Sequence, residues 1–265
     1  MLRRIGTMIL AIVLVACGGG DATDATDTTD TSAPDTTTSS TVPSTTEAPT
    51  TTVSPTTAPS TTGPSTSTTP ATDDLPGERI EFGPGAGDTV AVIGVRHDDV
   101  LNLRALPDPG SEILSEIPPR AENLTALGHT RDIGQAFWIA VEHEGVEGWV
   151  NFAFIGYLGQ VTDETATILD DLGERPTAAT MEDLGSIVAE SLATEAPDSD
   201  IVMSGPATTG DLGEVIYDVI GIGDDAVVGF RLHVFGEPGA DGFSLRTVEV
   251  TTLCGRGVTD DGLCL

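Results

Sequence analysis

Residues 100–107 read VLNLRALP, and from Leu101 to Ala105 every second residue is apolar. A period of two is the pattern of a β-strand that buries one face. Short runs of the same kind, rich in β-branched and aromatic residues, stand on either side and are separated by Gly, Pro and Asp. They are TVAVIGV (89–95), EILSEIP (112–118), NLTALG (123–128), FWIAVEHEG (137–145) and EGWVNFAFIGYLG (147–159). This spacing predicts a small all-β barrel over residues 88–159 and argues against βαβ units.

The same runs carry a family resemblance. The motif LNLRALP (101–107), the segment 110–117, the alternating residues after Trp138 and the triplet GWV (148–150) together resemble a bacterial SH3 domain of the cell-envelope type. The turn at 128–138 is longer than in many members of that family. The resemblance implies an SH3-like barrel that binds peptidoglycan or a protein or peptide partner, or that only packs against a neighbouring domain. It does not imply catalysis.

Two tryptophans are the candidate binding residues of this barrel. Trp138 and Trp149 each combine a large apolar face with one hydrogen-bond donor, which suits a platform for a ligand. The competing interpretation is that aromatic residues of so small a barrel are needed for its core. The sequence leaves both roles open for each tryptophan.

Residues 163–265 have a different pattern. Thr180 and Asp183 have the spacing of a helix-capping box, and apolar residues recur after them at helical intervals until Pro197, which is expected to end the helix. Four apolar runs joined by tight turns follow, and they predict an antiparallel meander. They are DIVMSG (200–205), EVIYDVIGI (214–222), AVVGFRLHVFG (226–236) and FSLRTVEVTTLC (243–254). The sequence therefore predicts an α+β domain in which a helix packs on the meander. Its last segment, LCGRGVTDDGLCL, is similar to the ends of uncharacterised exported actinobacterial proteins, a resemblance that implies no function.

The N-terminus has the features of an export signal. Residues 1–16 hold Arg3 and Arg4 and then a mostly apolar run that is too short to span a bilayer as a helix. The sequence LVAC, which ends at Cys17, resembles the lipobox of bacterial lipoproteins. The resemblance implies cleavage before Cys17, lipid on its thiol and attachment to the extracytoplasmic face of the cell membrane. The alternative is an ordinary secretory signal in which the cysteine is incidental.

Residues 17–76 are almost wholly Thr, Ser, Pro, Ala and Asp. Such a segment has too little apolar surface to offset the entropy of ordering it, so we expect a disordered linker. A flexible coil of this length spans roughly 40 Å, and Thr/Ser-rich stretches with Pro resemble O-glycosylated stalks. The predicted architecture is therefore multidomain, with a linker, an SH3-like barrel and an α+β domain in that order.

The two cysteines other than Cys17 are Cys254 and Cys264. An even pair in an exported chain is expected to form a disulfide, and closing so short a loop stabilises by a little under about 3 kcal/mol in the chain-entropy model. A redox-active pair would more often show C-x-x-C spacing. A thiolate metal site would need more ligands than this segment offers.

Charge and motifs limit the classes of function. The formal net charge is −31 and all 11 basic residues are arginine, so the chain has no electrostatic footprint for nucleic acid and would be repelled by anionic lipid headgroups. We expect no catalytic residue, no metal site and no cofactor, since no nucleophile elbow, P-loop, dinucleotide fingerprint or H-E-x-x-H motif is present. The main hypothesis is a non-enzymatic, membrane-anchored binding module of the cell envelope. Two alternatives are a cell-wall hydrolase or accessory enzyme with its chemistry in residues 163–265, and a ligand-sensing module.

The lipid on Cys17 is the only device expected to hold the protein at the membrane. Replacing Cys17→Ser removes the acceptor of the acyl chains, so the mature product is expected in the culture medium instead of the membrane fraction. Immunoblots of the two fractions measure this. Retention of the serine variant in the membrane, at the level of the unaltered protein, would contradict the lipid anchor.

Overall fold

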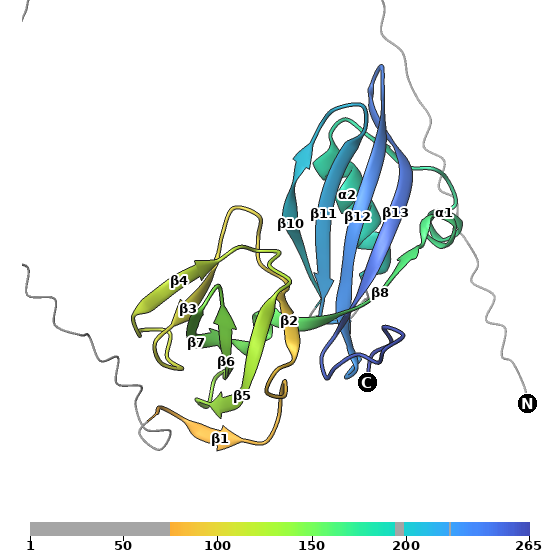
Figure 1. The fold of residues 1–265 in the computed structure, drawn as a ribbon. Coiled ribbons are helices and arrows are strands. Elements are labelled where there is room, and N and C mark those ends of the chain that lie inside the picture. The colour runs from red at the N-terminus through yellow and green to blue at the C-terminus, as the bar shows by residue number, and fades with distance from the viewer. Residues whose placement is uncertain (1–74, 194–198, 223) are drawn as a thin grey trace, which may run out of the picture. The chain divides into compact units, whose positions relative to one another are not determined.

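The computed structural model describes residues 75–193, 199–222 and 224–265. Cys17, the predicted signal peptide and residues 17–74 of the predicted linker lie outside the described residues, so those interpretations stay predictions. All described residues fall in one compact unit. They form a mostly antiparallel β structure with two α-helices (Figure 1).

The first group of elements lies between residues 78 and 163. It consists of β1 (Glu78–Ile80), β2 (Thr89–Val92), β3 (Leu101–Arg104), β4 (Ile113–Ile117), β5 (Leu124–Asp132), β6 (Phe137–His143), β7 (Val146–Asn151), the 3₁₀ turn η2 (Phe152–Phe154) and β8 (Ile155–Asp163). Each apolar run quoted above for residues 89–159 contains or overlaps a strand of this group, and β6 and β7 form an antiparallel hairpin. The period-two pattern was therefore a sound guide to where the strands lie.

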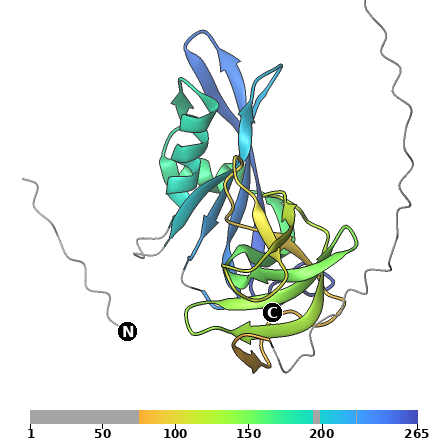
Figure 2. The same cartoon turned by 90° about the vertical axis from the view of Figure 1, so that its left-hand side faces the viewer.

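The second group contains both helices. It consists of α1 (Thr165–Leu172), β9 (Thr177–Ala178), α2 (Met181–Leu192), β10 (Asp200–Thr208), β11 (Gly213–Ile220), β12 (Val227–Gly239) and β13 (Gly242–Cys254). The predicted meander is confirmed, since β10, β11, β12 and β13 pair in that order and antiparallel. Figure 2 shows α2 lying against one face of these strands.

The capped helix is also confirmed. Thr180 stands just before α2, and its hydroxyl accepts the backbone N–H of Asp183 at 3.1 Å. The helix ends at Leu192, before the predicted stop at Pro197, a residue outside the described ones. Within α2, Gly185 permits close packing, because a Cβ there would lie 2.5 Å from the ring of Tyr217.

Helix α1 was not predicted. It has only eight residues, and its N-terminal Glu164 makes no side-chain capping hydrogen bond. Ile168 is its one buried side chain, and Gly173, with a φ of 75°, ends it. So short a helix leaves little periodicity in the sequence, which is why the pattern around it was uninformative.

β8 connects the two groups of strands. It pairs with β13 along one edge and with β2 along the other, so the strand order runs β10-β11-β12-β13-β8-β2-β5-β6-β7-β3-β4. Two large hydrophobic clusters lie on either side of this junction. One is built around β2 to β8 and includes Leu103 and Cys254, and the other lies between α2 and the strands β11 to β13.

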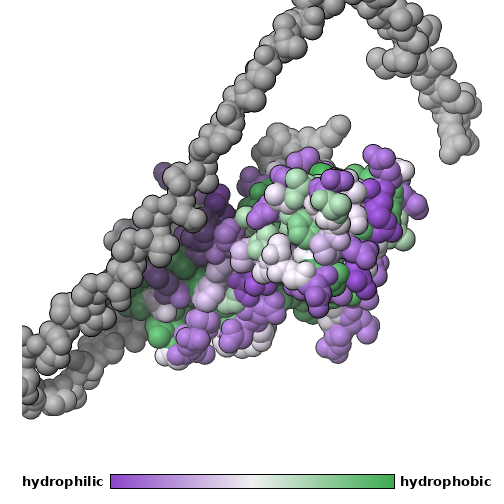
Figure 3. Space-filling view, turned by 90° about the horizontal axis from the view of Figure 1, so that it is seen from above, coloured by the Kyte–Doolittle hydropathy of each residue, from purple (hydrophilic) through white to green (hydrophobic). Residues whose placement is uncertain are grey.

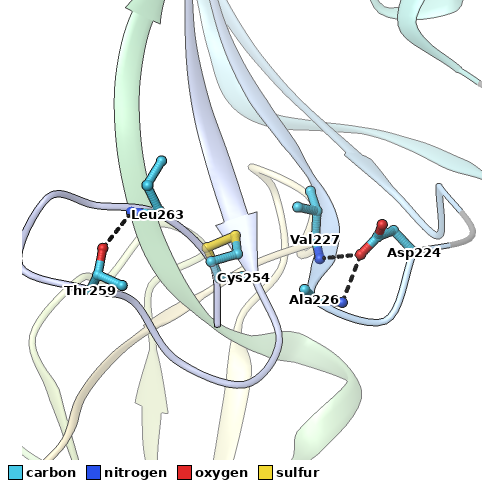
Figure 4. Close-up of a disulfide and its surroundings, with 7 residues drawn as sticks. Asp224, Ala226, Val227, Cys254, Thr259 and Leu263 are labelled. Carbon is cyan, nitrogen blue, oxygen red and sulfur yellow. Dashed lines mark hydrogen bonds between the residues drawn. A yellow bond between two sulfur atoms is a disulfide. The ribbon is translucent and has the colours of Figure 1, made fainter.

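The disulfide closes the C-terminal segment. Cys254 is bonded to Cys264, as predicted, with the two Cα atoms 5.2 Å apart. Cys254 is fully buried in the cluster around β2 to β8. Figure 4 shows the bond beside Thr259, whose hydroxyl accepts the N–H of Leu263 at 3.1 Å. The bridge thus ties the chain end to the junction at β8.

A buried ion pair lies at the same junction. Asp218 of β11 and Arg231 of β12 are register partners, and the guanidinium donates to both carboxylate oxygens, at 2.8 Å from Nε and 3.0 Å from Nη2. Ser204 donates to the same carboxylate at 3.0 Å, and so does the backbone N–H of Gly94 at 2.8 Å. Arg231 Nη2 also donates to the carbonyl of Val92 at 2.8 Å. The pair therefore binds β11 and β12 to the chain at the end of β2.

Asp218→Asn keeps the shape of the side chain but leaves the buried Arg231 cation without its counter-ion. We expect the free energy of unfolding to fall by about 3–5 kcal/mol, as it does when one partner of a buried pair is removed. Denaturant titration of the full chain measures it. Glu122→Gln is the matched control, because Glu122 is an exposed carboxylate 3.8 Å from the same guanidinium and its loss should change stability by less than about 1 kcal/mol. Equal losses in the two variants would contradict the role given to Asp218.

Candidate functional site

The two predicted binding residues lie on neighbouring strands. Trp138 is in β6 and Trp149 is in β7. On β6 the residues Ile139 and Val141 belong to the large cluster around β2 to β8, whereas Trp138 and Ala140 belong to a separate small one. Because successive side chains of a strand point to opposite faces, both indoles lie on the face opposite that core.

Both indoles are nonetheless well covered. Trp138 is 4% exposed and Trp149 is 7% exposed, and the side chains packed against their cluster are Leu75, Leu127, Ile133 and Ala136. The sequence left open whether these residues bind a ligand or form a core. The structure places them in a small cluster of their own, separate from the large cluster around β2 to β8, and the binding role stays a prediction.

Trp138 also lines a cavity. This cavity has a volume of about 450 Å³, which is within the range of small-molecule sites. It lies where the loop before β3, the start of η2 and strand β10 meet. Residues that line it include Asn102, Arg104, Trp138, Asn151, Phe154 and Val202. We call it the Trp138 cavity. Trp149 is not among its lining residues.

The polar side chains of the Trp138 cavity are held by hydrogen bonds. Arg104 Nη1 donates to the carbonyl of Ser111 at 2.7 Å, and Asn151 accepts the N–H of Ala153 at 3.0 Å, which caps η2. At the rim, Arg96 donates to Asp98 at 2.9 Å, and that hydrogen bond lowers the pKa of the Asp98 carboxyl. These anchors leave a site with fixed amide and guanidinium groups.

Two aromatic groups complete the Trp138 cavity. Phe154 is 37% exposed, so it is the more accessible ring, while Trp138 contributes at depth. The indole Nε1 of Trp138 is buried and has no hydrogen-bond partner among the described residues. Aromatic faces beside amide and guanidinium groups suit a polar ligand with apolar faces, such as a sugar or a short peptide. Phe154 was missed as a site residue because nothing in its sequence context separates it from Phe152.

The described residues offer little for catalysis or metal binding. In residues 75–193, 199–222 and 224–265, no group of three His, Cys, Asp or Glu side chains is placed to hold a metal ion. The one His–carboxylate contact within 4 Å in these ranges joins His233 to Glu214 at 3.4 Å. His143 is buried and its Nδ1 lacks a described partner.

The surface is mainly hydrophilic on the face seen in Figure 3. The exposed apolar side chains include Phe82, Phe137 and Phe154. The ring of Phe82 packs edge-on against the rings of Phe137 and Phe152. None of the helices in the described part of the chain has the length and apolar character needed to span a membrane.

Comparison of the chain with family models, with curated proteins and with solved structures found no match. The SH3-like and actinobacterial resemblances stay predictions from the sequence.

The only two tryptophans of the chain both lie in this region, so intrinsic fluorescence reports on it directly. Because both indoles are buried, we expect a blue-shifted emission maximum and weak quenching by iodide. Unfolding in denaturant should reverse both properties. Emission typical of water-exposed indole in the native protein would contradict the placement of Trp138 and Trp149.

Proposed function

We propose that this protein is a lipid-anchored lipoprotein of the cell envelope whose folded part is a non-enzymatic binding module. Lipid on Cys17 holds it at the extracytoplasmic face of the membrane, and residues 17–76 extend the folded part toward the cell wall. The disulfide between Cys254 and Cys264 supports an extracytoplasmic location, since structural disulfides persist in oxidising compartments.

The finer fold assignment belongs to the same proposal. Residues 88–159 form an SH3-like barrel and residues 163–265 form an α+β domain. Support comes from the two large hydrophobic clusters, one among β2 to β8 and one beneath α2. Support also comes from the antiparallel pairing of β2 with β5, β5 with β6 and β6 with β7.

The Trp138 cavity is the observation on which the binding function rests. It combines a volume of about 450 Å³ with an exposed ring at Phe154, fixed polar groups at Arg104 and Asn151, and the indole of Trp138. Glycan units and short peptides of peptidoglycan both present polar groups around apolar faces, which matches this lining. We therefore take peptidoglycan as the ligand and an envelope protein as the alternative partner.

Binding to purified peptidoglycan tests this function. The full chain should co-sediment with peptidoglycan above the level of a fragment limited to the linker, residues 17–76. Phe154→Ala removes the accessible ring of the Trp138 cavity, and we expect affinity to fall by about tenfold, the upper value for one aromatic contact.

Phe137→Ala is the matched control, because Phe137 is similarly exposed, at 43%, but does not line the Trp138 cavity. It should leave co-sedimentation unchanged. Equal losses in the two variants would place the binding elsewhere, and retention no better than that of the linker fragment would refute a wall-binding function.

A further inference from the structure

A second cavity lies beside the buried ion pair, since Ser204 lines it and donates to Asp218. Its volume is about 380 Å³. Its walls are three proline rings, Ala121 and the polar residues His97, Arg120 and Ser204. We call it the Arg120 cavity. It shares no lining residue with the Trp138 cavity.

The charge of the Arg120 cavity is opposite to that of the chain. The protein has 42 acidic and 11 basic residues, yet no Asp or Glu lines this cavity, whereas one guanidinium and one imidazole do. Arg120 is exposed and makes no hydrogen bond or ion pair with other residues in the described ranges. Among the described residues the side chain of Arg246 is likewise without a partner, but it lies on β13 and does not line the cavity, so Arg120 is the unengaged guanidinium at this wall.

Arg231 and its counter-ion Asp218 lie just behind this wall. Ser204, which lines the cavity, shares the Asp218 carboxylate with Arg231. Ala121, also in the wall, accepts the N–H of Val92, whose own carbonyl accepts from Arg231 Nη2. Nε and Nη2 of Arg231 are thus fully used by Asp218 and Val92.

The remaining nitrogen, Nη1 of Arg231, is buried and has no hydrogen-bond partner among the described residues. The Arg231 side chain is only 7% exposed. A buried donor of this kind loses its hydration without compensation, so a missing acceptor is expected nearby. Arg231 does not itself line the Arg120 cavity, so Nη1 becomes accessible from the cavity only when the exposed Glu122 beside it moves away.

Nη1 of Arg231 lies close to the side chain of Glu122. It follows Ala121 of the cavity wall, and its carboxylate oxygen lies 3.8 Å from Nη1, too far for a hydrogen bond. Its side chain is 61% exposed, so it can leave without disturbing the core. A guanidinium binds a carboxylate best at about 2.7–2.9 Å, a distance that Glu122 does not reach.

We propose that the Arg120 cavity binds a small ligand through a free carboxylate group. The carboxylate accepts hydrogen bonds from Arg231 Nη1 and from Arg120, while the proline rings and Ala121 contact the apolar part of the ligand. Glu122 swings aside as the ligand enters. The volume suits a ligand of two or three amino-acid residues or an organic acid of that size. This site is separate from the proposed wall-binding function and does not depend on it.

Isothermal titration calorimetry of the full chain with N-acetyl-alanyl-alanine tests the proposal. The free acid should bind, whereas the same dipeptide with an amidated C-terminus should not. Glu122→Gln removes the competing carboxylate and should tighten binding of the acid by about threefold. Arg120→Gln should weaken it by about fivefold.

Arg246→Gln is the matched control, because it removes the same charge from an exposed site on β13 that does not line the cavity. All three substitutions are at exposed residues, so the fold should persist, and thermal unfolding of each variant verifies this. The proposal is overturned if acid and amide bind equally, if Arg120→Gln and Arg246→Gln weaken binding by the same factor, or if neither the unaltered protein nor Glu122→Gln binds the acid.

Discussion

The contact between Asp218 and Arg231 is the constraint on which the arrangement of this protein depends. Both side chains are withdrawn from water, at a cost of several kcal/mol per ion, and this cost is offset only where a charged group is well hydrogen-bonded. The Asp218 carboxylate meets that condition, since it accepts four hydrogen bonds, from Ser204, Gly94 and two nitrogens of Arg231. Such a set is complete only when β10, β11, β12 and the end of β2 are all in place.

Both candidate sites follow from this constraint. Gly94, which donates to Asp218, lines the Trp138 cavity together with Val202 of β10. Ser204, which also donates to Asp218, lines the Arg120 cavity. Each cavity is therefore bounded by residues that the ion pair holds at the junction of the two groups of strands. A loosened junction would alter the two cavities together.

The arginine side chains of this acidic chain also connect separate segments of the fold through hydrogen bonds. Several donate to backbone carbonyls of other segments, 7 residues away in one case and 54 to 139 residues away in the others. They are Arg104 to Ser111, Arg131 to Gly77, Arg175 to Leu245 and Arg231 to Val92. The planar guanidinium, with five donors, suits this task better than a lysine ammonium would. Among the described arginines of this lysine-free chain, only the side chains of Arg120 and Arg246 make no hydrogen bond or ion pair.

The sequence by itself determined the local elements. The apolar runs located the strands other than β1 and β9, the box at Thr180 and Asp183 located α2, and the parity of cysteines indicated the bond between Cys254 and Cys264, because these patterns arise from neighbours in the chain. Helix α1 escaped, being too short for a clear period. Only the tertiary structure decided which face of β6 carries Trp138 and that Phe154 is the accessible ring. It also decided that Asp218 pairs with Arg231 and accepts a hydrogen bond from Gly94, which lies 124 residues before Asp218 in the sequence. Each of those facts depends on the register and packing of strands that are distant in sequence. The sequence around a charged residue in an apolar run does not indicate its ion-pair partner, because the partner is set by how the strands pair.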